Sequence, residues 1–432
     1  MSGFEKYPRL LIIGNCCLSD TTSNGRTLKN FLIGWPKDKI AQFCIRFESP
    51  DFSACDNYYC VSDRDALNAF LLRGAKNGKK EILDSNEENI PPITNKQVNR
   101  NAMSMYIRDI VWSSHRWQGK YFKKWVDEFS PELILFQAGD FGYLCRLAVN
   151  IAKERNIPIV IYNSEAYYFK NFDYLGSKGI AKLFYPLLRK RFCKSFEKLM
   201  KRASAAIYIC DMLKEDYEKH FDVPAYTIYT ATENKFAEKK IESRGDKLTV
   251  SYLGNLGVGR HEGLVDIGNA LQSISKDLYL DVYGKIPNEK VQKAFDGCEG
   301  IHYRGFVSYE QVKQIMRESD ILVHTENFSD YYRLDLKYAF STKIADSLAS
   351  GTCFLLYAPE ELAVSQYLTN NNVAYVVNYK KELKTALEML VNESDSRSRY
   401  AESAQALVEK NHISDKNSEE FQKILKNTIC GE

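Results

Sequence analysis

The sequence predicts an α/β protein made of two open, parallel-sheet domains, and three observations support this prediction. Short apolar, β-branched runs alternate with helical patterns along most of the 432 residues, an alternation typical of parallel βαβ units. Twelve such runs occur, which is more than one open sheet usually holds. A polar, charge-rich segment at 230–246 divides them into two sets of six.

Each half of the chain is long enough to bury its own core. We expect a first domain at 1–230, a linker at 231–246 and a second domain at 247–410. Residues 411–432 are expected to form a helix that crosses back to the first domain. The polar stretch 76–100 is expected to be an exposed loop of the first domain.

Helical patterns separate the strands, for example at 140–155 and 309–317, where apolar residues recur three and four apart. The strands are expected at 9–14, 40–46, 132–136, 158–162, 205–209, 226–229, 247–253, 279–283, 301–304, 321–324, 353–357 and 373–377.

The composition excludes several classes of protein. The 44% apolar and 27% charged residues suit a soluble globular chain rather than a disordered, collagen-like or coiled-coil one. No uncharged apolar stretch approaches 18 residues, so no transmembrane helix is expected. The apolar run at 10–14 is too short for a signal-peptide core. The eleven scattered cysteines are interpreted as reduced thiols of a cytoplasmic protein, and the six histidines lack metal-ligand spacing.

Ligands of open α/β sheets bind beyond the carboxyl ends of the strands. The first strand is followed by Ser23-Asn24-Gly25-Arg26-Thr27, a glycine-containing turn that opens a helix. Backbone N–H groups of Asn24 and Gly25 could there face an anion. The alternative is an ordinary loop with a capping side chain.

The first strand of the second domain leads into a glycine-rich turn at 254–261 that includes Arg260. Such a turn suits a diphosphate lying against the backbone, and Arg260 could bind it through two hydrogen bonds. The spacing G-x-x-G-x-G differs from the dinucleotide pattern. Asp281, about 20 residues further on, keeps a nicotinamide cofactor open as an alternative, and a merely flexible turn is another.

The segment 323–351 carries the most chemistry. Glu326 directly follows a strand, and residues 341–343 (Ser-Thr-Lys) begin a helix that carries Asp346 one turn later. A helix N-terminus presents unpaired N–H groups and partial positive charge, to which Lys343 and Lys337 add full charges. The sequence therefore predicts a phosphate site here, with Asp346 placed for a ribose. The alternative is a capped helix with Asp346 on a solvated face.

Together these segments resemble the GT-B glycosyltransferases, in particular the retaining family 4 enzymes that build bacterial surface polysaccharides. The resemblance rests on 23–27, on 252–256 and on Glu326 with 341–351, and strand order and spacing extend it over nearly the whole chain. It implies two Rossmann-like domains facing across a cleft, and a nucleotide diphosphate-sugar donor with no cofactor.

The resemblance also implies roles for single residues. Arg260 and Lys343 would hold the donor diphosphate, Asp346 the ribose, and residues near 305–307 the base. Glu326 would contact the sugar, and Gly25 would let the first domain approach the diphosphate. The donor-binding set that follows is Asn24, Gly25, Asn255, Arg260, Val307, Lys337, Ser341, Thr342, Lys343 and Asp346; the catalytic set is Glu326 and Glu165.

The chain departs from the family in two places. Tyr338 stands eight residues before Asp346, where the family has the first glutamate of a pair. Residues 163–165 (Asn-Ser-Glu) stand where many relatives have a histidine. Glu165 is the candidate to orient the acceptor hydroxyl, and a surface loop carboxylate is its alternative. In the family, retention is ascribed to front-face attack with the leaving phosphate taking the acceptor proton, and fixed cations and helix dipoles replace a metal.

A rival motif is Asp63-Arg64-Asp65, which has the D-x-D form that metal-dependent GT-A enzymes use. Because it precedes a helical pattern and follows Ser62, we interpret it as a helix cap and first turn rather than a metal site.

The stretch 178–202 is basic and amphipathic, with nine Lys and Arg against Glu197 alone. Such a stretch suits an anionic membrane surface. Nucleic acid is not the expected partner, because the whole chain carries a net charge of only +3 and no recognition motif accompanies the patch. A solvated helix packed on the first domain remains open.

The sequence thus predicts a metal-independent, retaining hexosyltransferase at the cytoplasmic face of a bacterial membrane. Its acceptor would be a glycan or a lipid-linked glycan, in capsule, exopolysaccharide or other cell-surface glycan synthesis. One alternative is a non-catalytic GT-B-like subunit that binds a partner glycosyltransferase or a glycoprotein. A nicotinamide dehydrogenase is the other.

Overall fold

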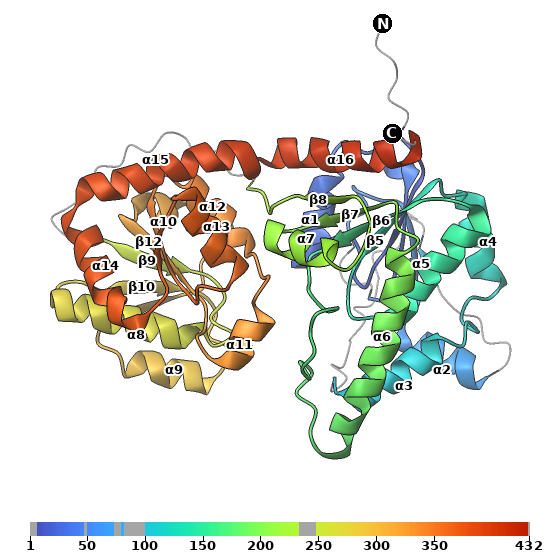
Figure 1. Cartoon of the computed structure of the whole chain (residues 1–432), viewed down its shortest axis with the longest axis horizontal. Helices are drawn as coiled ribbons and strands as arrows, with labels where there is room; N and C mark the ends of the chain where they lie inside the picture. Colours follow the sequence, from blue (N-terminus) through green and yellow to red (C-terminus); the bar gives the residue numbers. More distant parts are fainter. Residues whose placement is uncertain (1–6, 47–49, 73–78, 82–99, 233–247, 431–432) are drawn as a thin grey trace, which may run out of the picture. The chain divides into compact units, whose positions relative to one another are not determined.

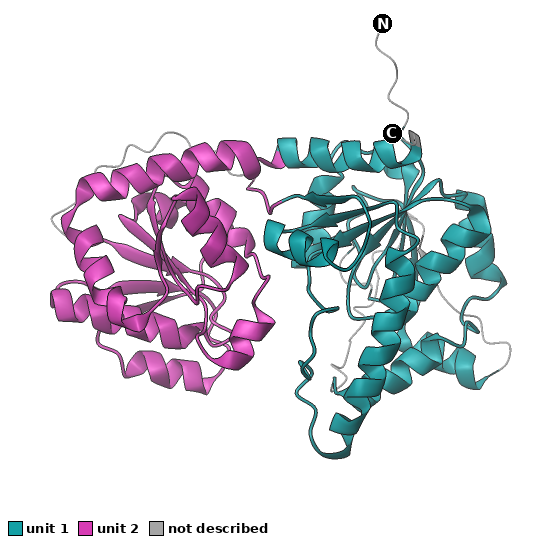
Figure 2. Ribbon diagram, viewed as in Figure 1, with its two compact units in different colours: residues 1–228, 415–432 teal, residues 229–414 magenta. Residues whose placement is uncertain are grey.

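The computed structural model describes residues 7–46, 50–72, 79–81, 100–232 and 248–430. The chain divides into two compact units, each of which is described by itself (Figure 2). Unit 1 comprises residues 1–228 and 415–432, and unit 2 comprises residues 229–414. The predicted linker lies almost wholly outside the described residues, as does most of the predicted loop at 76–100.

Unit 1 is built on an eight-stranded sheet in the order β4-β3-β2-β1-β5-β6-β7-β8 (Figure 1). All neighbouring strands are parallel except β4, which is antiparallel to β3. The central strands β1 and β5 are buried along their whole length and largely aliphatic, as expected when helices cover both faces of a parallel sheet. The strands are β1 (Leu10–Ile13), β2 (Ile40–Cys44), β3 (Asn57–Cys60), β4 (Lys79–Glu81), β5 (Leu133–Gln137), β6 (Ile159–Asn163), β7 (Ala205–Tyr208) and β8 (Ala225–Thr227).

Local capping signals begin several helices of unit 1. Ser62 and Asp65 form a reciprocal capping box at the start of α2, which confirms the helix-cap interpretation of the D-x-D motif. Asn101 and Ser104 do the same for α3. The helices are α1 (Ser23–Phe31), η1 (Lys37–Lys39), α2 (Asp63–Leu71), α3 (Ala102–Trp112), α4 (Lys120–Phe129), α5 (Gly142–Arg155), η2 (Gly179–Phe184), α6 (Tyr185–Met200), α7 (Asp211–Glu218) and α16 (Ser414–Cys430).

The C-terminal helix α16 packs on unit 1, which confirms the predicted return of the chain. The ring of Phe421 stacks on that of Phe31, with centroids 4.6 Å apart. Gln422 Nε2 donates hydrogen bonds to the backbone oxygens of Phe31 and Ile33 at 3.1 and 2.8 Å. These contacts cap the exposed carbonyls at the end of α1, so sequence-distant segments complete one core.

Unit 2 is built on a six-stranded, wholly parallel sheet in the order β11-β10-β9-β12-β13-β14. Its strands are β9 (Val250–Leu253), β10 (Leu280–Tyr283), β11 (Ile301–Gly305), β12 (Ile321–Thr325), β13 (Cys353–Tyr357) and β14 (Tyr375–Val377). Its helices are α8 (Arg260–Ile274), α9 (Glu289–Asp296), α10 (Tyr309–Glu318), α11 (Asp330–Asp335), α12 (Thr342–Ala349), α13 (Ala363–Asn371), α14 (Lys380–Asn392) and α15 (Ser394–Asn411).

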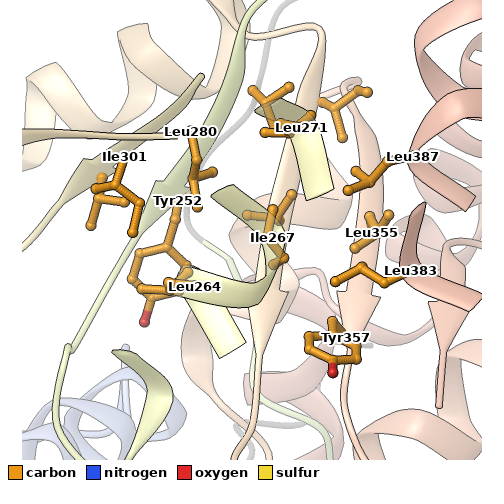
Figure 3. Close-up of a cluster of buried hydrophobic side chains, with 14 of the residues drawn as sticks. Tyr252, Leu264, Ile267, Leu271, Leu280, Ile301, Leu355, Tyr357, Leu383 and Leu387 are labelled. Carbon is orange, nitrogen blue, oxygen red and sulfur yellow. The ribbon is translucent and has the colours of Figure 1, made fainter. Parts of the chain in front are cut away.

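One hydrophobic cluster of unit 2 packs helices α8, α9 and α14 on the sheet. Figure 3 shows Leu264, Ile267 and Leu271 of α8 among strand residues such as Leu355, with Leu387 of α14 on the same cluster. Burying such aliphatic side chains contributes about 1.5–3 kcal/mol each relative to exposure. This packing fixes the start of α8, which carries the glycine-rich turn, against the sheet.

The chain enters and leaves unit 2 at neighbouring points. The Thr232 N–H donates to the backbone oxygen of His412 at 2.9 Å, and Thr232 pairs in parallel with Ile413. The imidazole of His412 is fully buried; its Nδ1 lies 2.7 Å from the Thr230 oxygen and its Nε2 2.9 Å from the hydroxyl of Tyr367. One buried side chain therefore joins the first and last segments of the unit.

All twelve predicted strands are present, and β3 and β4 were not predicted. The fold class is therefore confirmed, with one antiparallel edge strand added to unit 1. Within the described part of the chain, no helix is long and apolar enough to span a bilayer.

Candidate functional site

The strand order of unit 2 reverses between β9 and β12, which are neighbours in the sheet. Ligands of open α/β sheets bind at such a switch point, outside the carboxyl ends of the strands. The glycine-rich turn follows β9, and Glu326 follows β12. Two of the predicted site segments therefore meet at the position where this topology places a ligand.

The turn after β9 is held in one conformation by its own polar groups. Asn255 Oδ1 accepts from the Gly257 N–H at 2.8 Å, and the Tyr252 hydroxyl donates to the Asn255 oxygen at 2.7 Å. Gly259 has a φ of +75°, and a Cβ there would lie 2.4 Å from Asn327 Nδ2. Only glycine combines this backbone conformation with so close an approach. Hydrogen bonds therefore fix the conformation of the turn, and the turn positions Arg260 at the start of α8.

Arg260 and Glu326 form a two-point ion pair. Arg260 Nε donates to Glu326 Oε2 at 2.9 Å, and Nη2 donates to Oε1 at 2.6 Å. The side chains are only 11% and 5% exposed. The third guanidinium nitrogen, Nη1, makes a long hydrogen bond of 3.5 Å to the Asn255 oxygen. The guanidinium also makes a hydrogen bond with the side chain of Tyr252. A guanidinium carries five N–H donors, so an anion beside Nη1 can still be bound.

His324 completes the network from inside β12. Its Nε2 lies 3.0 Å from Glu326 Oε1, and its ring stacks on that of Tyr252. Burial lowers the pKa of His324; Glu326 partly opposes this, and the charges of Arg260 and Lys343 reinforce it. The neutral imidazole then donates Nε2–H to the carboxylate. The pKa of Glu326 is also lowered, because the His324 and Arg260 contacts outweigh the opposite effect of burial.

The side chain of Asn327 joins the end of β12 to the start of α8. Its Nδ2 donates to the Gly259 oxygen and to Glu262 Oε2, both at 2.9 Å. One turn into α8, a Cβ on Gly263 would lie 2.1 Å from Thr325 Oγ1. The helix and the strand therefore approach more closely than any side chain at residue 263 allows, and this contact fixes Arg260 relative to Glu326.

The start of α12 carries the third predicted segment. Ser341 is its N-cap and accepts from the Lys343 N–H at 3.4 Å. Lys343 is half-buried, and its charge acts on His324, so it belongs to the same electrostatic cluster as Arg260. Lys337 Nζ contacts the hydroxyl of Tyr338 at 3.0 Å. Thr342 is exposed.

Asp346, predicted to bind a ribose, accepts a hydrogen bond from Thr232. Thr232 Oγ1 lies 2.7 Å from Asp346 Oδ1, and Thr232 itself is 4% exposed. This bond fixes the orientation of the carboxylate. It also links α12 to the segment where the chain enters unit 2.

Val307 lies between the end of β11 and the capped start of α10, and it is half-buried. Gly305 has a φ of +83°, and the neighbouring Phe306 ring is exposed. The position therefore offers an apolar platform at the edge of the sheet of unit 2.

The remaining predicted residues belong to unit 1. Gly25 is buried, and a Cβ there would lie 2.5 Å from Thr22 Oγ1 and 2.7 Å from the Cys17 oxygen. Its N–H already bonds to the capping hydroxyl of Thr22 at 3.2 Å, so close packing accounts for this glycine. Asn24 is half-buried in the first turn of α1. Glu165 is half-buried just after β6.

The sequence did not identify His324, Thr232 or Asn327 as site residues. His324 was counted as part of a strand, and Thr232 as part of the linker. The dipeptide Glu326-Asn327 directly after a strand was a usable signal for Asn327, because polar residues at that place face the ligand edge. Among the described residues, no group of three His, Cys, Asp or Glu side chains is placed to hold a metal ion.

The chain is similar to glycosyltransferase-like proteins in part of its sequence and in its fold. Residues 267–423 match a family model described as glycosyl transferase-like. The search of curated proteins found no match. HepE of Anabaena in complex with UDP aligns with a TM-score of 0.65 at 10% identity, over 97% of this chain and 100% of its own.

Two further solved structures align over nearly the whole chain. The apo form of the lipopolysaccharide outer core galactosyltransferase WaaB aligns with a TM-score of 0.60 at 13% identity, over 98% of this chain and 99% of its own. Sucrose-phosphate synthase from Thermosynechococcus elongatus aligns with a TM-score of 0.60 at 10% identity, over the same shares. These likenesses show the fold: the chain has the GT-B fold, with two Rossmann-like parallel-sheet domains.

Proposed function

We propose that this protein is a glycosyltransferase that moves a hexose from a nucleotide diphosphate-sugar to a glycan or lipid-linked acceptor. The observation that carries the proposal is the buried Arg260–Glu326–His324 network at the switch point of unit 2, with Lys343 in the same electrostatic cluster. A fold that hosts many activities does not decide function, so the proposal rests on this site.

In this proposal the diphosphate lies between the turn before α8 and the start of α12. Arg260 Nη1, Lys343 and the amides at Ser341 and Thr342 neutralise the charge that develops on the leaving group, without a metal. Glu326 holds the guanidinium of Arg260 in place, because both of its oxygens are engaged by that side chain. It is thus a positioning residue, whereas the resemblance assigned it to the sugar.

The rest of the donor is proposed to follow the strand ends of unit 2. Asp346, whose Oδ1 accepts from Thr232 Oγ1, is proposed to accept from the ribose hydroxyls. Val307 is proposed to line the base, with the exposed ring of Phe306 beside it. Since HepE was solved with UDP, uridine diphosphate-sugars are the first donors to test.

Transfer with retention, a role in bacterial cell-surface glycan synthesis, and contact with an anionic membrane through 178–202 complete the proposal. Glu165, half-buried after β6, is the proposed group that orients the acceptor hydroxyl. Nuclear magnetic resonance of the product formed from a defined donor gives its anomeric configuration, and an inverted product would refute retention.

The decisive experiment titrates uridine, guanosine and thymidine diphosphate-sugars into the protein by calorimetry, then follows release of the nucleoside diphosphate in the presence of chelator. We expect binding of one of them and slow hydrolysis of its sugar. Absence of binding by all three would overturn the proposal.

A second candidate is a non-catalytic subunit of the same fold. It is favoured by Tyr338, which stands where the family has an acidic residue and is 9% exposed beside Lys337. A subunit of this kind would bind a nucleotide diphosphate or a partner but would show no hydrolysis and no transfer to any acceptor.

A further inference from the structure

Exposed apolar side chains gather on two adjoining elements of unit 1. Ile107 on α3 is 52% exposed, and Ile180 and Leu183 in η2 are 73% and 72% exposed. Isolated exposed aliphatic residues are common, but contiguous ones mark interaction sites. The set, named here the apolar tip, is Met103, Ile107, Ile110, Ile180, Leu183 and Leu187.

Three contacts spaced along α3 hold this helix beside η2 and α6. The Ala102 N–H donates to Ser177 Oγ at 2.8 Å, before η2 begins. The rings of Tyr106 and Phe184 lie 5.7 Å apart. Further along, Arg191 Nε donates to Asp109 Oδ2 at 2.7 Å. The helix α3 therefore packs against η2 and α6, and Figure 1 shows α3 beside the beginning of α6. The exposed apolar residues are thus carried by elements that pack on one another.

A stripe of lysines continues the apolar tip along α6. Leu183 and Leu187 are followed by Lys190, Lys194 and Lys198 at steps of three and four residues, which place them on one helical face. All three lysines are exposed, and none forms an ion pair with a described residue. The surface thus changes from apolar at one end to strongly basic along its length.

We propose that this surface docks on an anionic lipid bilayer, with the apolar tip among the acyl chains nearest the headgroups and the lysine stripe over the headgroup phosphates. The proposal deepens the proposed membrane contact, on which it rests, by adding α3 and separating an inserting end from an electrostatic one. Apolar insertion and basic attraction together give the stable attachment that neither gives alone.

Two other occupants fit the surface less well. Nucleic acid would use the lysines but would leave the aliphatic side chains of α3 and η2 in water, because phosphate backbones are bound by charge. A second copy of this chain would cover the apolar tip but would bring two rows of like charge together.

The test uses the full-length protein and co-sedimentation with vesicles of phosphatidylcholine, with or without about one third phosphatidylglycerol. We expect binding to the anionic vesicles that weakens with salt. The double variant Leu183→Ser with Leu187→Ser should lower the affinity roughly tenfold without changing the salt dependence. The triple variant with Lys190, Lys194 and Lys198 each changed to Gln should also bind weakly and should lose most of the salt dependence.

Matched controls are Ile33→Ser, an exposed aliphatic residue elsewhere on unit 1, and Lys276→Gln with Lys285→Gln on unit 2. Binding by the two test variants equal to that of the controls would overturn the proposal. So would binding of nucleic acid without vesicles, or a concentration-dependent dimer that the serine variant abolishes. Nucleotide-sugar affinity is measured on every protein as a control for folding. If the unaltered protein binds a nucleotide-sugar but no anionic vesicle, the docking surface alone is refuted, whereas if the unaltered protein binds no nucleotide-sugar, the proposed function is refuted.

Discussion

Arg260 and Glu326, 66 residues apart in the sequence, join the first turn of α8 to the end of β12 through two hydrogen bonds of 2.6 and 2.9 Å. The pair lies where the strand order of unit 2 reverses. Because both side chains are largely buried, each charge depends on the other for compensation. The same pair therefore bears on stability and on the position of the guanidinium.

Removing one partner should leave a buried charge unpaired. We expect Glu326→Ala to lower the free energy of unfolding by about 3–5 kcal/mol, measured by chemical denaturation. The exposed pair of Arg333 with Glu361 is a matched control, since its side chains are 43% and 40% exposed, and Arg333→Ala should cost less than about 1 kcal/mol. Equal losses in the two variants would contradict the burial argument.

Lys343 should contribute to donor binding through its charge. Lys343→Ala is expected to weaken nucleoside diphosphate binding by about 1.5–3 kcal/mol, the range for hydrogen bonds to charged groups, and Arg260→Ala by a similar amount. Lys343→Arg keeps the charge and should retain most of the affinity. Calorimetry with the free nucleoside diphosphate separates this effect from contacts to the sugar. Unchanged affinity in both alanine variants would refute the assigned diphosphate site.

The hydroxyl of Thr232 should matter for the donor although it lies 114 residues before Asp346. Thr232→Val keeps the shape and removes the hydrogen bond, so Asp346 loses a fixed orientation. We expect a loss of about 1.5–3 kcal/mol in nucleotide-sugar affinity, while Thr232→Ser should restore it. If the valine variant bound the donor normally, Asp346 would not be held for this purpose.

The pH dependence of stability should report on His412. Burial lowers its pKa from 6.5 to about 4, so the unfolded chain binds a proton that the folded unit does not over this range. This contribution is fully present above about pH 6.5 and is lost as the pH falls toward 4; a shift of this size corresponds to about 3 kcal/mol. The free energy of unfolding is measured from pH 7.5 to 4 for the protein and for His412→Asn. The difference between the two proteins should shrink by that amount as the pH falls. A difference that does not change with pH would contradict the lowered pKa of His412.

The closest helix–strand approach at the site should not tolerate a side chain. In Gly263→Ala the new Cβ would lie 2.1 Å from Thr325 Oγ1. We expect a loss of about 1–3 kcal/mol in stability from overpacking and weaker donor binding, because α8 carries Arg260. Gly297→Ala is the control, since its nearest neighbour would lie at 3.4 Å. Stability is compared by the midpoint of thermal unfolding. Equal changes of the midpoint in both variants would show that α8 and β12 can move apart to admit the new methyl group.

The strands of both sheets could be predicted because buried parallel strands are continuous apolar runs. Strand β3, Asn57–Cys60, escaped prediction because it is short and follows a polar segment, and β4, Lys79–Glu81, because its three residues are all charged. Sequence spacing correctly brought Arg260, Glu326 and Lys343 to one edge. It did not reveal that Glu326 pairs with Arg260, that His324 contacts Glu326, or that Thr232 bonds to Asp346. Such contacts depend on how elements pack, not on local pattern.

The parallel pairing of Thr232 with Ile413 gives unit 2 adjoining ends. A domain whose two ends adjoin can be inserted into another protein as one piece, because the chain is interrupted at only two neighbouring points and the sheet of the domain stays intact. Under the proposed function, recombination at these two positions would exchange the half that is proposed to bind the donor while leaving the other half intact. New pairings of sugar and acceptor could then arise in a single genetic step.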